Sequence, residues 1–219
     1  MKTKENIESL FNNLKTWIEF PKYQAERRLD VFFGLYLEDI LKRCRNELFR
    51  KEDHLVLIPE FPLQKNDTNN ECTNIDYLVF NTTKQSVHAI ELKTDNHSID
   101  DEQIKYYHKF KDNIELKELF DFVKRPRTGR SGKKYKALYK YIKDSALEDC
   151  STKGNVIYLL PLELQTIKDE GFDSIPCSEI VEKMKPYTSE DELLDSFLDC
   201  LSHIGLQEQE KENYRRRRS

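Results

Sequence analysis

The segment Ile75–Asp95, IDYLVFNTTKQSVHAIELKTD, decides the fold of this chain. Val, Ile, Tyr and Phe fill two runs, at 75–81 and 86–93, and the polar residues 82–85 separate them. This arrangement is typical of two β-strands joined by a short turn, so we predict an antiparallel hairpin. Because apolar residues occupy both faces of the runs, we predict that the hairpin lies inside the protein.

The turn of this hairpin determines which residues face one another. A turn centred on Thr83 and Lys84 places Asp76 opposite Glu91, at a Cβ separation of roughly 4.5–5.5 Å. Lys93 follows two residues after Glu91, and alternation along a strand puts it on the same face. The same register pairs Phe80 with Val87 and Leu78 with Ala89.

Two carboxylates at this separation need a compensating charge. Like charges directly across a ladder destabilise it, and a buried carboxylate pair must hold a proton, a cation or a salt partner. A divalent cation meets this need, and oxygen ligands suit Mg²⁺ or Mn²⁺ better than Zn²⁺. The alternative is that Glu91 and Lys93 form an ordinary salt bridge and that Asp76 only begins a strand. The turn register, the expected burial and the flanking residues together favour the cation site.

The pattern Asp76, then Glu91-Leu92-Lys93 on the next strand, resembles the active-site hairpin of the PD-(D/E)XK nuclease superfamily. Ile75 stands where the family frequently has Pro. The resemblance implies an α/β fold with a restriction-endonuclease-like core, that is, a central mixed β-sheet flanked by α-helices. It also implies that Asp76, Glu91 and the Leu92 carbonyl hold Mg²⁺, for which Mn²⁺ can substitute, and that Lys93 is catalytic.

A further carboxylate is expected on the helix before the sheet. Residues 22–45 carry a broad apolar stripe at helical spacing, and Glu26 lies one turn before it on the inward side. Many members of the superfamily have a Glu on this helix, so the resemblance implies that Glu26 completes the catalytic and metal-binding set. Glu38 is the alternative, but Lys42 and Arg45 near it indicate a solvated, ion-paired face.

The helix after the hairpin, expected to begin near Ser98, carries Gln103 and Tyr107. Their i,i+4 spacing puts both side chains on one face. The pair resembles the QxxxY element of the RecB-type branch of the superfamily. The resemblance implies that Gln103 and Tyr107 steady Lys93 or the nucleic-acid strand.

Residues 124–143, KRPRTGRSGKKYKALYKYIK, contain nine basic residues, three tyrosines and no acid, in a chain of net charge −4. This run favours a surface that binds phosphates and stacks on unpaired bases, whereas the alternative is an ordinary solvated face. Gly129, Ser131 and Gly132 predict a flexible loop in its middle. The candidate nucleic-acid-binding residues here are Lys124, Arg125, Arg127, Arg130, Lys133 and Lys134.

Composition indicates an ordered globular protein. The chain has 219 residues, 35% of them charged, and has no apolar run of the roughly 20 residues that cross a membrane. The polar N-terminus does not resemble a secretory signal. The five scattered cysteines, without a CxxC pair or a nearby His grouping, favour reduced thiols and argue against a zinc site. We therefore expect a cytoplasmic protein with no membrane partner.

We predict a single domain over residues 1–206. It includes an accessory helix at 1–20 and a C-terminal helix at 185–206, and we expect the charged tail 207–219 to be disordered. The predicted function is Mg²⁺-dependent hydrolysis of phosphodiester bonds in DNA, with endonuclease or exonuclease action left open. The alternatives are a catalytically degenerate nucleic-acid-binding module and a protein-interaction scaffold, and a homodimer or protein partner is compatible with each.

Overall fold

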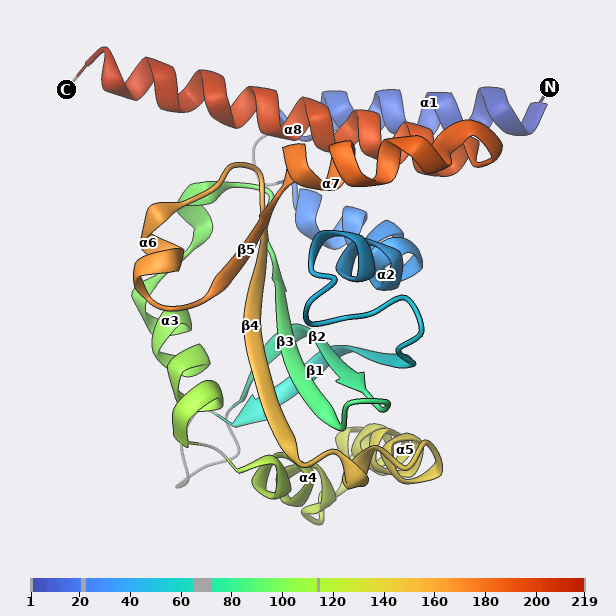
Figure 1. Ribbon diagram of the computed structural model, residues 1–219, viewed down its shortest axis with the longest axis vertical. Helices are drawn as coiled ribbons and strands as arrows, with labels where there is room; N and C mark the ends of the chain where they lie inside the picture. The colour runs from blue at the N-terminus through green and yellow to red at the C-terminus, as the bar shows by residue number, and fades with distance from the viewer. Residues whose placement is uncertain (1, 21–22, 65–71, 114, 219) are drawn as a thin grey trace. The chain divides into compact units, whose positions relative to one another are not determined.

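The computed structural model describes residues 2–20, 23–64, 72–113 and 115–218. It has a five-stranded mixed β-sheet flanked by helices (Figure 1), which confirms the predicted α/β class. The chain divides into two compact units, which are described one at a time. The first comprises residues 1–51, 92–99 and 158–219, and the second comprises residues 52–91 and 100–157. The single domain over residues 1–206 stays a prediction.

The sheet has the strand order β1-β2-β3-β4-β5. Its strands are β1 (Leu55–Gln64), β2 (Cys72–Asn81), β3 (Ser86–Leu92), β4 (Thr152–Leu160) and β5 (Asp173–Pro176). β2 pairs antiparallel with both β1 and β3. β4 runs in the same direction as β3, because the N–H of Thr152 donates to Gln85 O and the N–H of Lys93 donates to Leu159 O. The sheet is therefore mixed.

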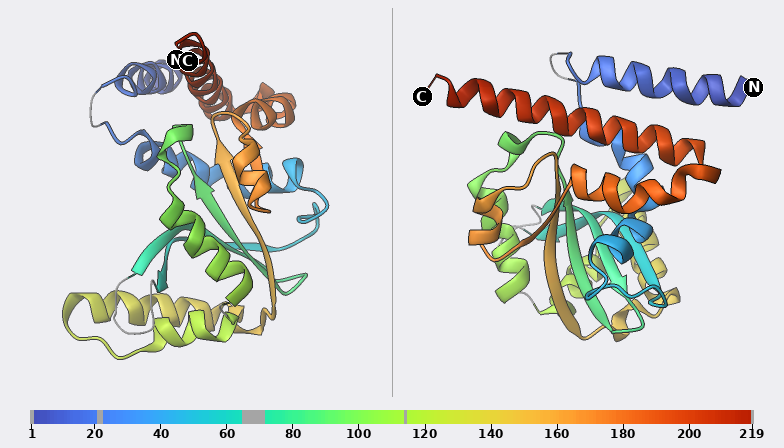
Figure 2. Two further views of the ribbon diagram at one scale, coloured as in Figure 1. Left: turned by 90° about the vertical axis from the view of Figure 1, so that its left-hand side faces the viewer. Right: turned by 45° about the horizontal axis from the view of Figure 1, so that its top comes forward.

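The second unit is built on the β2–β3 hairpin, and every residue of β3 is buried. Its helices are α3 (Asp101–His108), the π-helix η2 (Lys109–Asn113), α4 (Leu116–Lys124), α5 (Gly129–Asp144) and the 3-10 turn η3 (Leu147–Asp149). α4 packs against β1 and lies beside α5 (Figures 1 and 2). The Phe120 ring of α4 stacks on Phe80 of β2, with centroids 6.1 Å apart. Helix α4 therefore covers part of the β1–β2 surface that carries Phe80.

The first unit is mainly helical. Its elements are α1 (Lys2–Trp17), α2 (Ala25–Cys44), η1 (Asn96–Ser98), α6 (Gln165–Asp169), α7 (Cys177–Met184), η4 (Lys185–Glu190) and α8 (Glu192–Arg216), with β5. α1 lies beside α8 (Figures 1 and 2). The two helices are parallel, because Lys4 pairs with Glu192 at 3.2 Å and Lys15 pairs with Asp199 at 2.7 Å. In the core, the Phe197 ring of α8 contacts the rings of Phe32, Phe33 and Tyr36 of α2.

The C-terminal helix is longer than the sequence predicted. α8 starts at Glu192 and continues to Arg216, so the expectation of a disordered tail from residue 207 is wrong for the residues described. Ion pairs one turn apart support the extension, Lys211 with Glu208 and Arg215 with Glu212. Glu208 is buried, which ties this part of the helix to the rest of the first unit.

Two observations bear on the expected environment of the protein. Among the residues that the structure describes, no helix has the length and apolar character needed to cross a membrane. All five cysteines are free thiols. Burial raises the pKa of the Cys177 thiol to about 12, so this thiol stays protonated at neutral pH.

Candidate functional site

The β2–β3 hairpin has the predicted register. Phe80 pairs with Val87 and Leu78 with Ala89, as a turn centred on Thr83 and Lys84 requires. The last assigned pair is Tyr77 with Ile90. One further step along the same register leads to Asp76 on β2 and Glu91 on β3. The hairpin thus brings the two predicted carboxylates to neighbouring positions on adjacent strands.

Glu91 is only 2% exposed, so its charge is almost removed from water. Helix α3 supplies two hydrogen bonds to it: the Gln103 amide donates to Oε1 and the Tyr107 hydroxyl donates to Oε2. Hydrogen bonds to an ionised carboxylate are among the stronger ones in proteins, and they offset part of its cost of burial. Gln103 and Tyr107 therefore hold the Glu91 carboxylate in one orientation.

Helix α3 begins in a way that positions Gln103. The Asp100 side chain is the N-cap and accepts from the Gln103 N–H at 2.7 Å. The expected start near Ser98 is thus wrong by a few residues, because Ser98 belongs to the separate turn η1. The i,i+4 relation of Gln103 and Tyr107 is as predicted, and the structure shows that both side chains donate to Glu91. The sequence had indicated Lys93 or the nucleic acid.

Asp76 is half-buried between the fully buried neighbours Ile75 and Tyr77. On β1, the residue across from Asp76 is Glu60, since Pro59 pairs with Tyr77 and Phe61 with Ile75. Glu60 has a φ of 51°, a left-handed conformation, and the ladder between β1 and β2 has no assigned pair at this position.

The Glu60 side chain is exposed. It accepts a hydrogen bond from the Asn74 amide at 2.6 Å. The ladder between β1 and β2 resumes on both sides of this residue. The interruption of the ladder therefore coincides with the position of Asp76.

Leu92, Lys93 and Glu26 belong to the first unit. Leu92 is the last residue of β3, and Lys93 extends the strand by one residue, with its N–H bonded to Leu159 O at 2.9 Å. Glu26 lies half-buried in the first turn of α2. The participation of these three residues in one site with Asp76 and Glu91 stays a prediction.

Glu38 behaves as the sequence indicated. It forms an i,i+4 ion pair with Lys42 at 2.8 Å. Arg45 differs from the expectation, because it pairs with Asp173 and Glu179, both at 2.7 Å, and thereby joins the end of α2 to β5 and α7. Glu38 therefore belongs to an ion-paired face of α2.

The basic segment 124–143 is helical over most of its length, which corrects the prediction of a flexible loop. Helix α5 begins at Gly129, whose φ of +68° suits a residue without a side chain. Gly132 is buried against the backbone of Arg127, and a Cβ at this position would lie 2.1 Å from Arg127 O. The two glycines therefore form a close turn into the helix, where the sequence had suggested flexibility.

The six candidate cations of this segment fall into two groups. Lys124 pairs with Glu148 at 2.8 Å, which raises the pKa of its amino group. Arg127 packs on the Tyr135 ring at 3.6 Å and donates to the Phe122 carbonyl at 2.9 Å. These two side chains are engaged within the second unit. The other four candidates, Arg125, Arg130, Lys133 and Lys134, are exposed.

The donor set at the hairpin fits a hard divalent cation. Each oxygen of an ionised carboxylate has two lone pairs, and the hydrogen bonds from Gln103 and Tyr107 occupy one on each oxygen of Glu91. Ligating carboxylates commonly accept such outer hydrogen bonds, which fix their orientation. With Asp76 as the second carboxylate, the donors are oxygens, which Mg²⁺ prefers.

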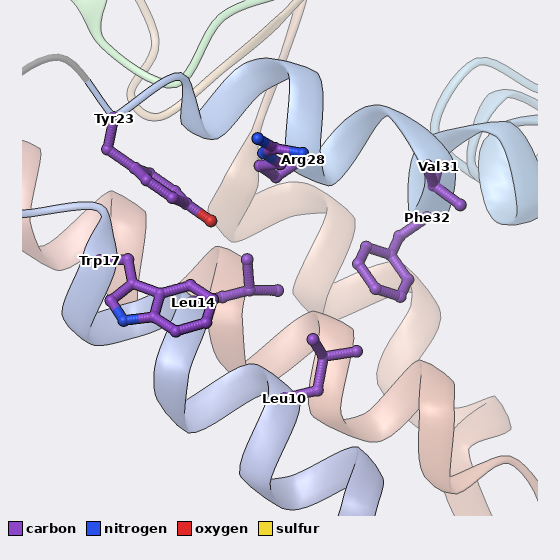
Figure 3. Close-up of a pocket in the computed structure, with 7 residues that line it drawn as sticks. All are labelled: Leu10, Leu14, Trp17, Tyr23, Arg28, Val31 and Phe32. Atoms are coloured by element: carbon purple, nitrogen blue, oxygen red, sulfur yellow. The ribbon is translucent and has the colours of Figure 1, made fainter.

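Pockets also lie elsewhere in the units. A hollow of about 320 Å³ in the first unit lies between α1 and α2, with Trp17 on one side and Tyr23 on the other (Figure 3). Among the described residues of its lining, Arg28 is the charged one, and Val31 at its edge is 71% exposed. A pocket of about 370 Å³ in the second unit is lined by residues of 115–124 and 148–151. Neither lining contains a predicted metal ligand.

The structure also groups three side chains that the sequence analysis did not select. In the first unit, one ligand atom each from Asp95, His97 and Glu208 lie within 4.8 Å of one another. Asp95 and His97 are near in sequence, but Glu208 follows more than 100 residues later. No local pattern indicates such a grouping.

Comparison with known proteins was made at three levels. The scan against family models, the search of curated proteins and the search of solved structures each found no match.

Proposed function

We propose that this protein is a Mg²⁺-dependent nuclease that hydrolyses phosphodiester bonds in DNA, with a restriction-endonuclease-like core. The observation that carries the proposal is the register of the β2–β3 hairpin, which leads to Asp76 and Glu91 on adjacent strands. The burial of Glu91 and its fixed orientation support it. A carboxylate held in one orientation is suited to bind a metal ion, because its oxygens already point in a fixed direction.

Asp76 and Glu91, with the Leu92 carbonyl and Glu26, would hold the ion. When bound, Mg²⁺ polarises the scissile phosphate and lowers the pKa of a bound water. Gln103 and Tyr107 act through Glu91 as positioning residues, because their hydrogen bonds prevent the carboxylate from rotating. The tight packing of β3, buried at each position, limits movement of the strand that carries Glu91.

Lys93 is the proposed catalytic amine. It follows Glu91 by two residues in a strand extension held by Leu159 O, and this spacing directs both side chains to the same face of the strand. An ammonium group there would orient the attacking water and stabilise the negative charge that develops on the phosphate.

Helix α5 is the proposed contact surface for the DNA backbone. Arg130, Lys133 and Lys134 are exposed, and they form no ion pair with any other residue described in residues 72–113 or 115–218. Unpaired cations on one helix attract phosphates without sequence preference. Tyr141, 47% exposed, offers a ring that can stack on an unpaired base.

One observation favours a second candidate, a nucleic-acid-binding module without catalysis. The hydrogen bonds of Gln103 and Tyr107 already compensate much of the buried Glu91 charge, so the fold does not need an ion for this purpose. Such a module would retain the basic surface of α5 and bind DNA equally well with and without a divalent ion.

An assay of the wild-type protein separates the two candidates. Single-stranded, linear duplex and circular DNA are incubated with the protein in Mg²⁺, in Mn²⁺ and in EDTA, and binding is measured in parallel. The nuclease proposal expects cleavage with either ion and none in EDTA, and cleavage of the circle would identify an endonuclease. Binding without cleavage under each condition would establish the second candidate. Absence of both binding and cleavage would favour a protein-interaction scaffold.

A further inference from the structure

The turn η1 presents two side chains that can bind a metal. The Asp95 Oδ1 atom accepts from the His97 N–H at 2.7 Å, and Ser98 Oγ donates to Asp95 O at 2.7 Å. The buried Asn96 side chain anchors the turn, because it accepts from the Leu162 N–H at 3.3 Å and donates to Leu162 O at 3.4 Å. The backbone that carries Asp95 and His97 is therefore held on both sides.

Helix α8 contributes a third side chain, Glu208, which is 1% exposed. Its Oε2 atom accepts from Lys211 at 3.3 Å. Its Oε1 atom is buried and has no hydrogen-bond donor among residues 2–20, 23–64, 72–113 and 115–218. This atom lies 3.6 Å from His97 Nε2. A buried carboxylate oxygen without a donor is unfavourable, and here it is directed at an imidazole nitrogen.

The side chains around these atoms carry more negative than positive charge. His97 Nε2 also lies 2.9 Å from Glu212 Oε1, and Arg215 lies 3.2 Å from the same oxygen. Lys211 is 3.6 Å from Asp95 Oδ2. Three carboxylates thus face two cationic side chains, Lys211 and Arg215, that are both about half-exposed.

We propose that Asp95, His97 and Glu208 form a site for a first-row transition-metal ion of the Zn²⁺ class. An imidazole nitrogen with two carboxylates is a donor set that Zn²⁺ accepts, whereas Mg²⁺ prefers oxygen alone. The Glu208 Oε1 atom gains the partner that it lacks, and the ion adds the missing positive charge.

The geometry requires only a small contraction. Zn²⁺ binds nitrogen and carboxylate oxygen at about 2.0–2.2 Å, so ligand atoms of a tetrahedral site are about 3.4 Å apart. The present atoms lie within 4.8 Å of one another. Side-chain rotation of His97, which is 49% exposed, shortens these separations without moving the helix. Zn²⁺ at His97 Nε2 replaces the contact of this atom with Glu212 Oε1, and Lys211 moves from Glu208 into solvent.

The ion would join η1 to α8 within the first unit. η1 begins three residues after Lys93, so the ion would fix the segment that follows the strand extension. This is a structural site, distinct in its ligands from the proposed Mg²⁺ site, and it does not depend on nuclease activity.

Zn²⁺ binding to the full chain tests this proposal by isothermal titration calorimetry. The protein is first treated with EDTA and dialysed, and the titration is made in excess Mg²⁺ to occupy oxygen-only sites. We expect one Zn²⁺ per chain, with affinity reduced at least about tenfold in Glu208→Gln and in His97→Ala. Histidine side-chain ¹⁵N spectra should show one ring that shifts on binding, and this signal should be absent in His97→Ala.

Two controls make the result decisive. Glu210→Gln removes the same charge from the exposed side of α8 and should bind Zn²⁺ as the wild type does. Asp76→Asn alters the proposed Mg²⁺ site and should also leave Zn²⁺ affinity unchanged. Equal affinity in wild type, Glu208→Gln and His97→Ala would overturn the proposal. So would a loss of binding in Asp76→Asn alone. His97→Ala keeps the test valid if Glu208→Gln does not fold, because His97 is half-exposed.

Discussion

Glu91 and Glu208 are both almost fully buried, yet their carboxylates have different environments. Glu91 receives a neutral donor on each oxygen, Gln103 on one and Tyr107 on the other. Glu208 has Lys211 on one oxygen and no donor on the other among the residues described in the first unit. Burial alone therefore does not distinguish a positioned ligand from a carboxylate that still needs a cation. The hydrogen-bond donors that each carboxylate oxygen receives distinguish the two cases.

Replacing each glutamate by leucine gives the largest expected contrast. Glu91→Leu removes the acceptor of two donors, each of which costs about 1–3 kcal/mol when buried without a partner, so we expect a loss of about 3 kcal/mol or more. Glu208→Leu removes a poorly compensated charge, and we expect a change within about 1 kcal/mol in metal-free buffer. Urea unfolding of both variants measures the difference. Equal destabilisation would contradict the contrast.

The second unit contains another buried ionisable group with neutral partners, His88. Its Nδ1 accepts from the Asn155 N–H at 3.1 Å and its Nε2 lies 3.0 Å from Ser86 Oγ. Burial, with a smaller effect of Lys84, lowers the pKa of His88 to about 4. The neutral ring thus contributes stability above the ordinary pKa of about 6.5, and this contribution is lost as the pH falls toward 4.

The expected effect is a fall in unfolding free energy of roughly 2 kcal/mol from this group between pH 7 and pH 5. NMR titration of the histidine rings measures its pKa directly, with the exposed His54 as an internal comparison. A His88 ring that titrates near 6.5 would show that the neutral hydrogen-bond network is not maintained.

Removing one donor from Glu91 should have a smaller effect than removing the Glu91 carboxylate itself. Tyr107→Phe deletes the hydrogen bond to Oε2 and leaves the ring in place, and loss of a hydrogen bond to a charged group costs about 1.5–3 kcal/mol. The matched control is Tyr141→Phe, which alters an exposed hydroxyl and should change stability by less than about 0.5 kcal/mol. If the two variants unfold at the same urea concentration, Tyr107 does not hold Glu91.

The smallest effect concerns the cations of the basic segment. Lys134→Ala should weaken DNA binding and reduce the dependence of log K on log salt by about 0.9 if the side chain contacts one phosphate. Lys124→Ala should change this slope less, because Lys124 is paired with Glu148. Fluorescence anisotropy with labelled duplex DNA over a range of salt concentrations measures both. Identical slopes for the two variants would remove α5 from the proposed binding surface.

The sequence was most informative where short-range geometry sets the structure. The polar turn residues were sufficient to predict the hairpin register, including the pairing of Phe80 with Val87. The i,i+4 relation of Gln103 and Tyr107 followed from helical periodicity. Both depend on residues near one another in the chain, where the backbone permits few alternatives.

Contacts between distant segments were not predictable. Which residue Gln103 and Tyr107 bind depends on how α3 packs against β3, and the family resemblance did not indicate Glu91. Gly132 suggested a flexible loop, but its role is to admit the Arg127 carbonyl, and this close approach is visible only in three dimensions. The Glu208 grouping likewise depends on α8 meeting a turn far away in sequence.

The central claim, that the Glu91-Leu92-Lys93 strand carries a nuclease site, is tested most directly by the variant Lys93→Ala. Cleavage of DNA in Mg²⁺ is measured for wild type, Lys93→Ala and the control Lys105→Ala, which removes an exposed amine from α3. Circular dichroism and DNA binding are recorded for the same samples. The account predicts that Lys93→Ala folds and binds DNA but cleaves more than about 100-fold more slowly, while Lys105→Ala cleaves normally. Cleavage by Lys93→Ala at the wild-type rate would contradict it.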